Sequence, residues 1–576
     1  MPEELKLDEI TSYRKNLEFD AKDDDLVLAI NTAVQESKDL KEKMDEIGKI
    51  NKKYWKDGTA KDLSRLHPKK PKTVTNRIFV DVETSIPILT SEVPEPTVVG
   101  ATDNTIQQTI QKGLQIAYEV KYRLQQKLQT LIRQWYLYRI GVLKYRWDKE
   151  KGFTTEPILA RKIGFDRRAT SKANCEYVWE ELEDTIENLI TKFKSKEKEI
   201  TTLIGNQDNK KAKIKYLEFW GGNGKWVCWK LRTLILDKKK NPNFDYGTPE
   251  QLTAMGHIPA QEGVNNVFEK PEFPYLFLNV FSIGDETGLY DETSIIEEAA
   301  SLQEGANQLE QQILELNEGQ KRVWVLTNVA EEVAQDLINK TGDLAVRTKQ
   351  PNAATQVQSG KPDAALFNHL AHLLSEIDNI FGIHSTTRGA SPQRQETLGA
   401  QKLQTGQDYG RQDLIVRNVE QLIEEWYNAY LHCIKVFSVE AEVLNNGKET
   451  IELTREMIPQ GIQVMVKKGS TLPIDRQTKM ANAIQLAQFQ MIDPKTLFQE
   501  MGYPNEDQRV QDLFQWLAMT GKIQMPEQPI SPEQQTDQAK LEQIKRARQM
   551  METAKGLPPE EQSQVVGQIQ QTAQTI

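Results

Sequence analysis

The chain has 576 residues and a formal net charge of −10 at pH 7. A chain of this length normally forms more than one domain, because single hydrophobic cores rarely extend beyond ~300 residues. The acidic balance argues against a protein that holds nucleic acid by bulk electrostatic attraction. The three cysteines, Cys175, Cys228 and Cys433, are too widely spaced for a disulfide framework or a zinc motif, which favours a reducing compartment.

Neither end of the chain nor its interior carries a membrane signal. No apolar run approaches the ~20 residues needed to cross a bilayer. The N-terminus, residues 1–5, lacks the basic and apolar regions of a signal peptide. We therefore expect a soluble cytoplasmic protein with no membrane partner.

The first half of the chain predicts helices followed by strands. Residues 25–55 predict an amphipathic helix with one apolar side, formed by Val27, Ile30, Val34, Leu40, Met44 and Ile47. The basic stretch 67–72 after it is either a solvated loop, which we favour, or a phosphate contact. Residues 105–140 predict one long helix, which leads into an alternating strand at 141–147. Residues 217–220 and 225–229 predict a hairpin around a Gly-rich turn, and residues 273–281 an extended segment.

Two apolar tracks in the middle of the chain are its most regular feature. In each, apolar residues recur at alternating steps of three and four, which places them on one stripe of a helix and suits helix-on-helix packing. The first track is Ile295, Ala299, Leu302, Ala306, Leu309, Ile313 and Leu316; the second is Leu366, Leu370, Leu373, Ile377 and Ile380. Residues 320–362 between them predict a compact insertion with strands at 323–326 and 344–347 and a helix near 329–340. The sequence thus predicts one helix leading out, a small head and one helix leading back.

The remaining chain predicts mostly helices. Residues 385–395 form a polar loop with turn residues at Gly389 and Pro392. A long helix is expected over 396–437, then strands at 450–453 and 462–466. Residues 474–521 predict helices broken near Pro494 and Pro504, and a further helix is expected near 532–554.

No constellation of catalytic residues is recognisable. The chain has no GxxxxGK[ST], HExxH or GxSxG motif. His369 and His372 are three residues apart, but their neighbours are apolar, so we interpret them as packing or surface histidines and not as metal ligands. We therefore expect no enzyme activity, no catalytic or metal site and no cofactor. A nuclease built on acidic clusters is a weaker alternative.

The first track carries an unusual excess of acids. Glu297, Glu298, Glu304, Glu310, Glu315 and Glu318 decorate it, and no Lys or Arg follows until Lys321 and Arg322. A solitary surface helix usually mixes charges to gain support between residues i and i+4. One interpretation is a solvated acidic face. The other is a ring of copies with their apolar seams packed together and their carboxylates lining a hole.

The order of these elements resembles the portal proteins of tailed bacteriophages. Residues 166–170 with 175–178 are similar to a stretch before the wing helix of many portal proteins, 217–220 to the following wing strand, and 389–403 to the start of the tunnel-loop helix. The resemblance implies a mainly α fold with smaller α+β parts. It would comprise a wing (1–292), a first stem helix (293–319), an α/β clip (320–362), a second stem helix (363–384), a tunnel loop (385–395), a long kinked helix with returning wing strands (396–470) and a helical crown with a Gln-rich C-terminal tail (471–576).

The resemblance also implies roles for particular residues in a closed ring, for which twelve copies is the usual number in that family. Stem packing would fall to Ile295, Leu302, Leu309, Ile313, Leu316, Leu366, Leu370, Leu373 and Ile377. The acidic stem lining would be Glu297, Glu304, Glu310, Glu315 and Glu318. The tunnel loop would present Ser385, Thr386, Thr387, Arg388, Gln393, Arg394 and Gln395 to the channel, and the clip would dock partners through Lys321, Arg322, Arg347 and Lys349.

These roles imply a function in virus assembly. The ring would sit at one capsid vertex of the virion, assembled in the bacterial host cytoplasm, and serve DNA packaging, genome retention and ejection. Its partners would be further copies of itself, double-stranded DNA, the terminase, head–tail adaptors, and the major capsid and scaffolding proteins. A coiled-coil scaffold or adaptor without a DNA channel is the alternative.

Overall fold

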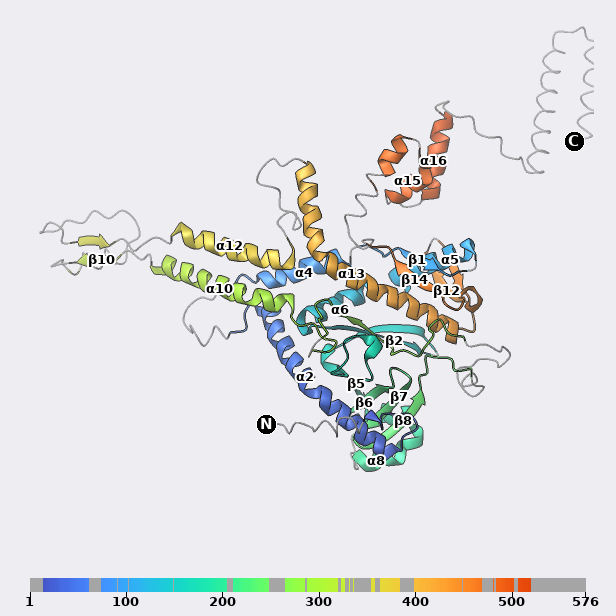
Figure 1. Cartoon of the computed structure of the whole chain (residues 1–576). Helices are drawn as coiled ribbons and strands as arrows, with labels where there is room; N and C mark the ends of the chain where they lie inside the picture. Colours follow the sequence, from blue (N-terminus) through green and yellow to red (C-terminus); the bar gives the residue numbers. More distant parts are fainter. Residues whose placement is uncertain are drawn as a thin grey trace, which may run out of the picture. The chain divides into compact units, whose positions relative to one another are not determined.

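The computed structural model describes residues 14–61, 74–90, 92–101, 103–148, 150–204, 211–247, 265–284, 287–319, 323–326, 354–357, 363–383, 398–447, 449–468, 483–489, 491–501 and 506–519, with Glu331, Gln335 and Met480. The chain divides into two units, Met1–Gln477 and Thr478–Ile576. Helices dominate both, and small antiparallel sheets occur in the first (Figure 1). The expectation of a mainly α fold with smaller α+β parts is confirmed.

The largest sheet of the first unit has five antiparallel strands in the order β4-β5-β6-β7-β8. Their bounds are β4 Ile163–Phe165, β5 Val178–Thr185, β6 Lys213–Gly221, β7 Trp226–Leu231 and β8 Leu234–Lys240. The hairpin of β6 and β7 confirms the predicted one. Its turn places Gly224 at φ +84, where a Cβ would lie 2.6 Å from the backbone of Glu272 and Phe273, so only glycine fits there.

A second sheet of three strands has the order β3-β2-β9, with bounds β2 Gly141–Asp148, β3 Gly152–Ile158 and β9 Tyr275–Leu278. A buried charge network joins it to the five-stranded sheet. The Lys144 ammonium of β2 donates to Glu180 (2.6 Å) and to Glu218 (2.7 Å) of β5 and β6. The Tyr275 hydroxyl donates to Glu180, and the indoles of Trp220 and Trp229 donate to Glu218. Because each charge is hydrogen-bonded, the network holds the two sheets in one arrangement.

The N-terminal helices are α2 Asp23–Asp57, α4 Arg77–Leu89, α5 Asn104–Ile116 and α6 Leu124–Tyr138. Helix α2 confirms the expectation for 25–55, with Val27, Ile30 and Met44 buried. The prediction of one helix over 105–140 is wrong. A π-helical turn, η1 Ala117–Lys121, follows α5, and Arg123 adopts the left-handed conformation (φ 46) before α6 starts. Short helices α7 Ile186–Lys192 and α8 Glu197–Ile204 follow β5.

The central helices are α10 Ile295–Gly319, α12 Ala364–Phe381 and α13 Leu398–Phe437, which confirm the expected helices of this region. Between the first two, β10 Val323–Leu326 pairs with β11 Ala354–Val357. The predicted first strand is confirmed. Its partner, β11, begins ten residues after the start of the strand predicted at 344–347. Residues 344–347 and most of the predicted helix 329–340 lie outside the described residues.

Two small sheets complete the first unit. Strand β12 Glu442–Asn445 pairs with β13 Thr450–Leu453, and β14 Gln463–Val466 pairs with β1 Pro96–Val99. The main core lies where α13 crosses α4, α5, α6 and the three-stranded sheet, and its largest buried side chains include Trp426, Tyr427 and Tyr430. All three cysteines are buried free thiols.

The second unit contains α15 Pro494–Glu500 and α16 Glu506–Met519, which pack against each other. Proline begins α15, where its missing N–H costs no helical hydrogen bond, so the break predicted near Pro494 is confirmed. The predicted helix near 532–554 lies outside the described residues. Within the described part of the chain, no helix is both long and apolar enough to span a membrane.

Candidate functional site: the paired helices α10 and α12

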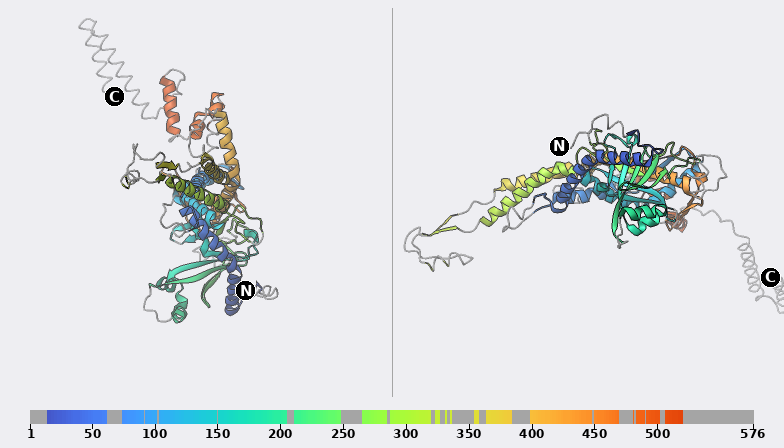
Figure 2. Two further views of the ribbon diagram at one scale, coloured as in Figure 1. Left: turned by 90° about the vertical axis from the view of Figure 1, so that its left-hand side faces the viewer. Right: turned by 90° about the horizontal axis from the view of Figure 1, so that it is seen from below.

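Helices α10 and α12 lie side by side and extend together from the body of the first unit (Figures 1 and 2). The chain runs out along α10, forms the β10–β11 pair and returns along α12. The Asp363 carboxylate caps the first turn of α12, and Gly382, in the left-handed conformation, ends it. The predicted helix out and helix back are present, and of the predicted head between them the structure describes the β10–β11 pair.

The apolar tracks pack largely within the chain. Ile295 and Ala299 of α10 and Ile377 of α12 belong to the main core, and Leu302 packs against it. Gly305 faces α12 closely, since a Cβ there would lie 3.4 Å from Leu373 Cδ1. Towards the far end the tracks are less covered: Leu366 and Leu370 are half-buried, as is Leu309, and Leu316 is 40% exposed, although Ile313 is buried.

Two of the predicted lining acids are engaged by cations of the same chain. Glu297 pairs with Arg139 and accepts a hydrogen bond from Asn51 (3.1 Å). Burial alone would raise the pKa of Glu297, but the hydrogen bonds from Arg139 and Asn51 outweigh it and lower that pKa. Glu304 accepts a hydrogen bond from Thr59 (2.6 Å) and lies 3.3 Å from Lys61. These two carboxylates face α6 and the end of α2, which differs from the expected open acidic wall.

Two other acids of α10 accept hydrogen bonds from uncharged groups. Glu310 accepts a hydrogen bond from the Thr75 backbone N–H (3.1 Å), and Glu315 accepts one from Gln311 (3.3 Å). Glu298 is exposed. The side chain of Glu318 lies outside the described residues.

Buried amides, which the sequence analysis missed, fasten α10 to the chain around α4. Gln303 is fully buried; its carbonyl oxygen accepts from Arg77 N–H (3.0 Å) and its amide donates to Thr75 O (2.8 Å). Asn307, one turn further along α10, donates to Gly58 O (2.9 Å). In the sequence, Gln303 and Asn307 stand at positions i and i+4 beside the apolar track. This spacing is compatible with buried hydrogen bonds, but it also fits a solvated helix face.

Apart from Glu298 and the partly exposed Glu376, the exposed residues described on this helix pair carry no Asp, Glu, Lys or Arg. On α10 the exposed residues beyond Glu298 are Ser301, Gln308, Gln312, Leu316 and Asn317. On α12 no Asp, Glu, Lys or Arg occurs between 364 and 375, and the exposed residues there are Ala364, Ala365, Phe367, Asn368, His369, Ala371, His372 and Ser375. We call these residues of the two helices the uncharged face. In a chain with 27% charged residues, such a surface on a projecting element is typical of protein contact.

Comparison with known proteins identifies this region. The family model described as the phage SU10 portal protein matches residues 273–556, which include α10, α12, α13 and the β10–β11 pair. Over these residues the chain is therefore similar to a phage portal protein family. The resemblance seen in the sequence is confirmed.

Solved structures similar to this chain come from gene transfer agent (GTA) particles. The "Neck of empty GTA particle computed with C6 symmetry" has 11% sequence identity and a TM-score of 0.38, and the match covers 77% of this chain and 93% of that one. The "Virion of native gene transfer agent (GTA) particle" has 11% identity and a TM-score of 0.36, with 74% and 90% covered. No curated protein matches the sequence.

Several residues expected to act in a portal lie outside the described residues. They include all those of the predicted tunnel loop, Ser385, Thr386, Thr387, Arg388, Gln393, Arg394 and Gln395. They also include the predicted docking cluster Lys321, Arg322, Arg347 and Lys349. His369 and His372 are exposed on α12, and the described residues contain no group of three or more His, Cys, Asp or Glu side chains that could hold a metal ion.

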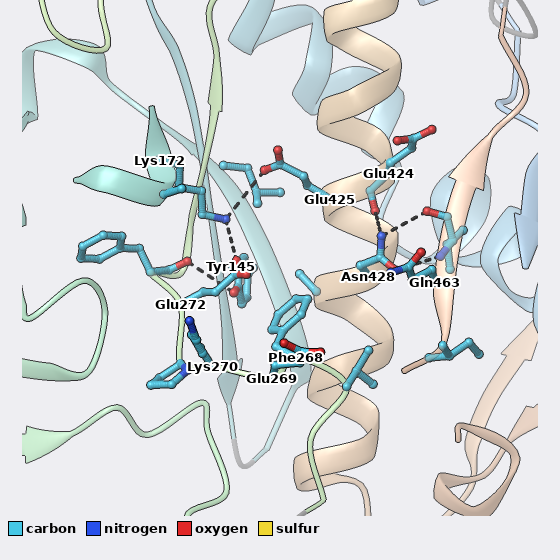
Figure 3. Close-up of a pocket in the computed structure, with 18 of the residues that line it drawn as sticks. Tyr145, Lys172, Phe268, Glu269, Lys270, Glu272, Glu424, Glu425, Asn428 and Gln463 are labelled. Atoms are coloured by element: carbon cyan, nitrogen blue, oxygen red, sulfur yellow. Dashed lines mark hydrogen bonds and ion pairs between the residues drawn. The ribbon is translucent and has the colours of Figure 1, made fainter. Parts of the chain in front are cut away.

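A groove of about 880 Å³ separates α13 and β14 from the sheet region (Figure 3). The Lys172 ammonium lies between two carboxylates, 3.0 Å from Glu272 and 3.7 Å from Glu425. Asn428 of α13 holds β14 by donating to Val464 O and accepting from Val464 N–H. The groove walls are therefore tied together by their own ion pairs and hydrogen bonds.

Beside this groove, His432 of α13 is buried as a neutral imidazole. Its Nε2–H donates to Asn243 O (2.7 Å), and its Nδ1 accepts from Val267 N–H (3.2 Å). The Phe268 ring stacks on the imidazole at 4.3 Å. Burial lowers the pKa of His432 to about 4 because an imidazolium would lose its hydration there.

The folded state binds the His432 proton less well than the unfolded state does. The contribution of the neutral imidazole to the free energy of unfolding is therefore fully present above pH 6.5 and is lost as the pH falls towards 4. Between pH 7 and pH 4 we expect the free energy of unfolding to fall by about 2–3 kcal/mol less in His432→Gln than in the wild type. Chemical denaturation between pH 7 and pH 4 measures it, with exposed His372→Gln as the control. An unchanged pH dependence in His432→Gln would show that the imidazole is not the titrating group.

Proposed function

We propose that this chain assembles into a ring-shaped portal at one capsid vertex of a tailed phage, through which double-stranded DNA is packaged, retained and ejected. In this assignment the helices α10 and α12 form the stem, the β10–β11 segment belongs to the clip, and residues 385–395 form the tunnel loop. The residues before the stem form the wing, to which the C-terminal part of α13 and its following strands return. The second unit forms the crown.

The observation that supports the proposal best is the uncharged face of the projecting helices within the portal family region. Much of the two apolar tracks packs between α10, α12 and the main core of the same chain. Contact between copies would therefore use the uncharged face of the two helices. Ser301, Ala364 and Ala371 are small enough to let neighbouring helices approach closely, and Phe367 supplies apolar area to bury. Contacts that repeat head to tail form a ring when the rotation from one copy to the next closes on itself.

The charge arrangement fits a conduit better than a binding protein. Glu297 and Glu304 are compensated inside the chain, so any acidic wall would depend on Glu298, Glu310, Glu315 and Glu318. Phosphates would meet a surface that is neutral or weakly repulsive. Many cationic contacts would instead hold DNA strongly and stall its movement.

The partners that we propose follow from this position in a virion. The clip would meet the terminase during packaging and the head–tail adaptors afterwards, through Lys321, Arg322, Arg347 and Lys349. The wing and crown would face the major capsid and scaffolding proteins. Nucleotide hydrolysis would belong to the terminase.

Electron microscopy of the purified full-length chain tests the proposal directly. We expect closed rings with a central hole wide enough for a DNA duplex, and a single large species, near twelve copies, in multi-angle light scattering. Rods or small oligomers without a hole would instead support the scaffold alternative. Ring-forming protein whose α10 and α12 lie at the outer rim would contradict the stem assignment.

A further inference from the structure

The C-terminal end of helix α2 carries a row of cations. This helix runs from the five-stranded sheet to the base of α10, where Asn51 donates a hydrogen bond to Glu297 (Figure 1). Near that end four exposed lysines follow one another at steps of three, one and three, so they lie on one stripe of the helix, away from buried Asn51. We call these residues the lysine stripe: Lys49, Lys52, Lys53 and Lys56.

The lysine stripe is not neutralised by acids of its own chain. Within the described part of the chain, none of its four side chains takes part in an ion pair or a hydrogen bond. Earlier on the same helix the pattern differs, since Lys41 pairs with Asp45 at i+4 (2.8 Å). The acids that flank the stripe in sequence, Glu46 and Asp57, are themselves exposed and form no ion pair with it. The stripe therefore presents its charges to solvent.

The stability of the helix does not explain the stripe. Its lysines lie at i+3 and i+4 spacing, where like charges destabilise a helix. The helix dipole favours a cation in the last turn, but this effect falls off within one turn and so covers Lys56 and not Lys49 or Lys52. An anionic partner would account for four cations on one stripe, because it would compensate all of them at once.

We propose that the lysine stripe binds the phosphates of double-stranded DNA without reading the base sequence. From Lys49 to Lys56 the stripe extends about 10.5 Å along the helix axis. One DNA strand carries a phosphate for every ~3.4 Å of duplex axis, so this length faces about three phosphates. A protein partner fits less well, because lysines are depleted in protein–protein interfaces, whereas a row of cations along a helix is typical of nucleic-acid contact.

This DNA contact is separate from the uncharged face, since the stripe lies on α2 and not on the projecting helices. The inference goes beyond the proposed function, because four lysines on one chain can bind a duplex with or without a ring. The net charge of −10 repels DNA from the chain as a whole. The contact should therefore be weak, short-ranged and lost at high salt.

Fluorescence anisotropy of a short labelled duplex, titrated with the full-length chain, measures this contact. The stripe variant combines Lys49→Gln, Lys52→Gln, Lys53→Gln and Lys56→Gln. At low salt we expect its affinity to be at least tenfold below that of the wild type. Between about 50 and 200 mM salt, the slope of log affinity against log salt should become smaller by about 3, because each phosphate contact contributes ~0.9 to it.

The matched control removes the same number of charges from exposed lysines elsewhere on the first unit, and its affinity should stay within threefold of the wild type. It combines Lys151→Gln, Lys194→Gln, Lys198→Gln and Lys213→Gln. The basic stretch 67–72 lies outside the described residues and stays unchanged in every variant. Circular dichroism should show that the stripe variant melts no lower than the wild type, because repulsion between its lysines has been removed.

Equal affinity and an equal salt slope in the wild type and the stripe variant would overturn the proposal in favour of an acidic protein partner. An equal loss in the control would also overturn it, since net charge and not the stripe would then set the affinity. Electron microscopy of the same samples scores ring formation separately. Rings without a difference in DNA binding would contradict this inference alone, and a difference in DNA binding without rings would contradict only the proposed function.

Discussion

Replacing Phe367 by Asp should leave the chain folded and abolish ring formation. Phe367 is 48% exposed in the single chain, so a carboxylate there remains hydrated and costs the monomer little. At a contact between copies the same carboxylate would be buried without a cation, because the uncharged face contains none. Such burial costs several kcal/mol, and the cost recurs at every contact around a ring.

Light scattering and electron microscopy of Phe367→Asp measure the result, and circular dichroism checks that its helices persist. Val439→Asp is the control, since Val439 is an exposed apolar residue (68%) that follows α13, away from the uncharged face. We expect rings from the control and monomers or small oligomers from Phe367→Asp. Wild-type ring yield from Phe367→Asp would show that contact between copies uses another surface.

Replacing Lys144 by Met should cause the largest loss of monomer stability among single changes of charge. Lys144 is the one cation in the buried network, and its removal leaves the Glu180 and Glu218 carboxylates facing each other. Breaking a buried ion pair in this way costs about 3–5 kcal/mol. Chemical denaturation at pH 8 should show this loss, while the exposed Lys112→Met, whose partner is Glu449, should change stability by less than about 1 kcal/mol.

The pH dependence of Lys144→Met provides an internal check. In the wild type, burial would raise the pKa of Glu218, but Lys144 and the two indole donors outweigh it and lower that pKa. Without Lys144 the Glu218 carboxylate binds a proton more readily, so the stability deficit of the variant relative to the wild type should shrink between pH 8 and pH 5. A deficit that stays constant over this range would mean that lost packing, and not uncompensated charge, destabilises the variant.

The helix pair could be predicted from the sequence because a 3.6-residue period reports directly on a buried stripe. Periodicity does not say which partner covers the stripe. The tracks are shared between α10, α12 and the main core, where we expected contacts between copies. The charges near α10 in the sequence also do not reveal the ion pairs of its acids. Glu297 has no cation nearby in the sequence, because its partner, Arg139, lies 158 residues away.

Strand pairing was predictable only where a hairpin is local. The turn at 221–224 predicted the pairing of β6 with β7. The pairing of β1 with β14 joins segments that are far apart in the sequence, and the residues of neither strand indicate which strand it pairs with. The break between α5 and α6 has no proline or glycine at its left-handed residue, Arg123. There the tertiary packing of Tyr118 and Tyr122 in the core overrides local preference.

The buried amide of Asn51 also has a mechanical consequence. It donates to Leu137 O, Ser294 Oγ and Glu297, so one side chain ties α2 and α6 to the start of α10. Directional bonds of this kind resist sliding, whereas apolar surfaces slip past each other more easily. A force or torque applied to the far end of α10 would therefore be transmitted to helices α2 and α6 of the body and would not be confined to α10.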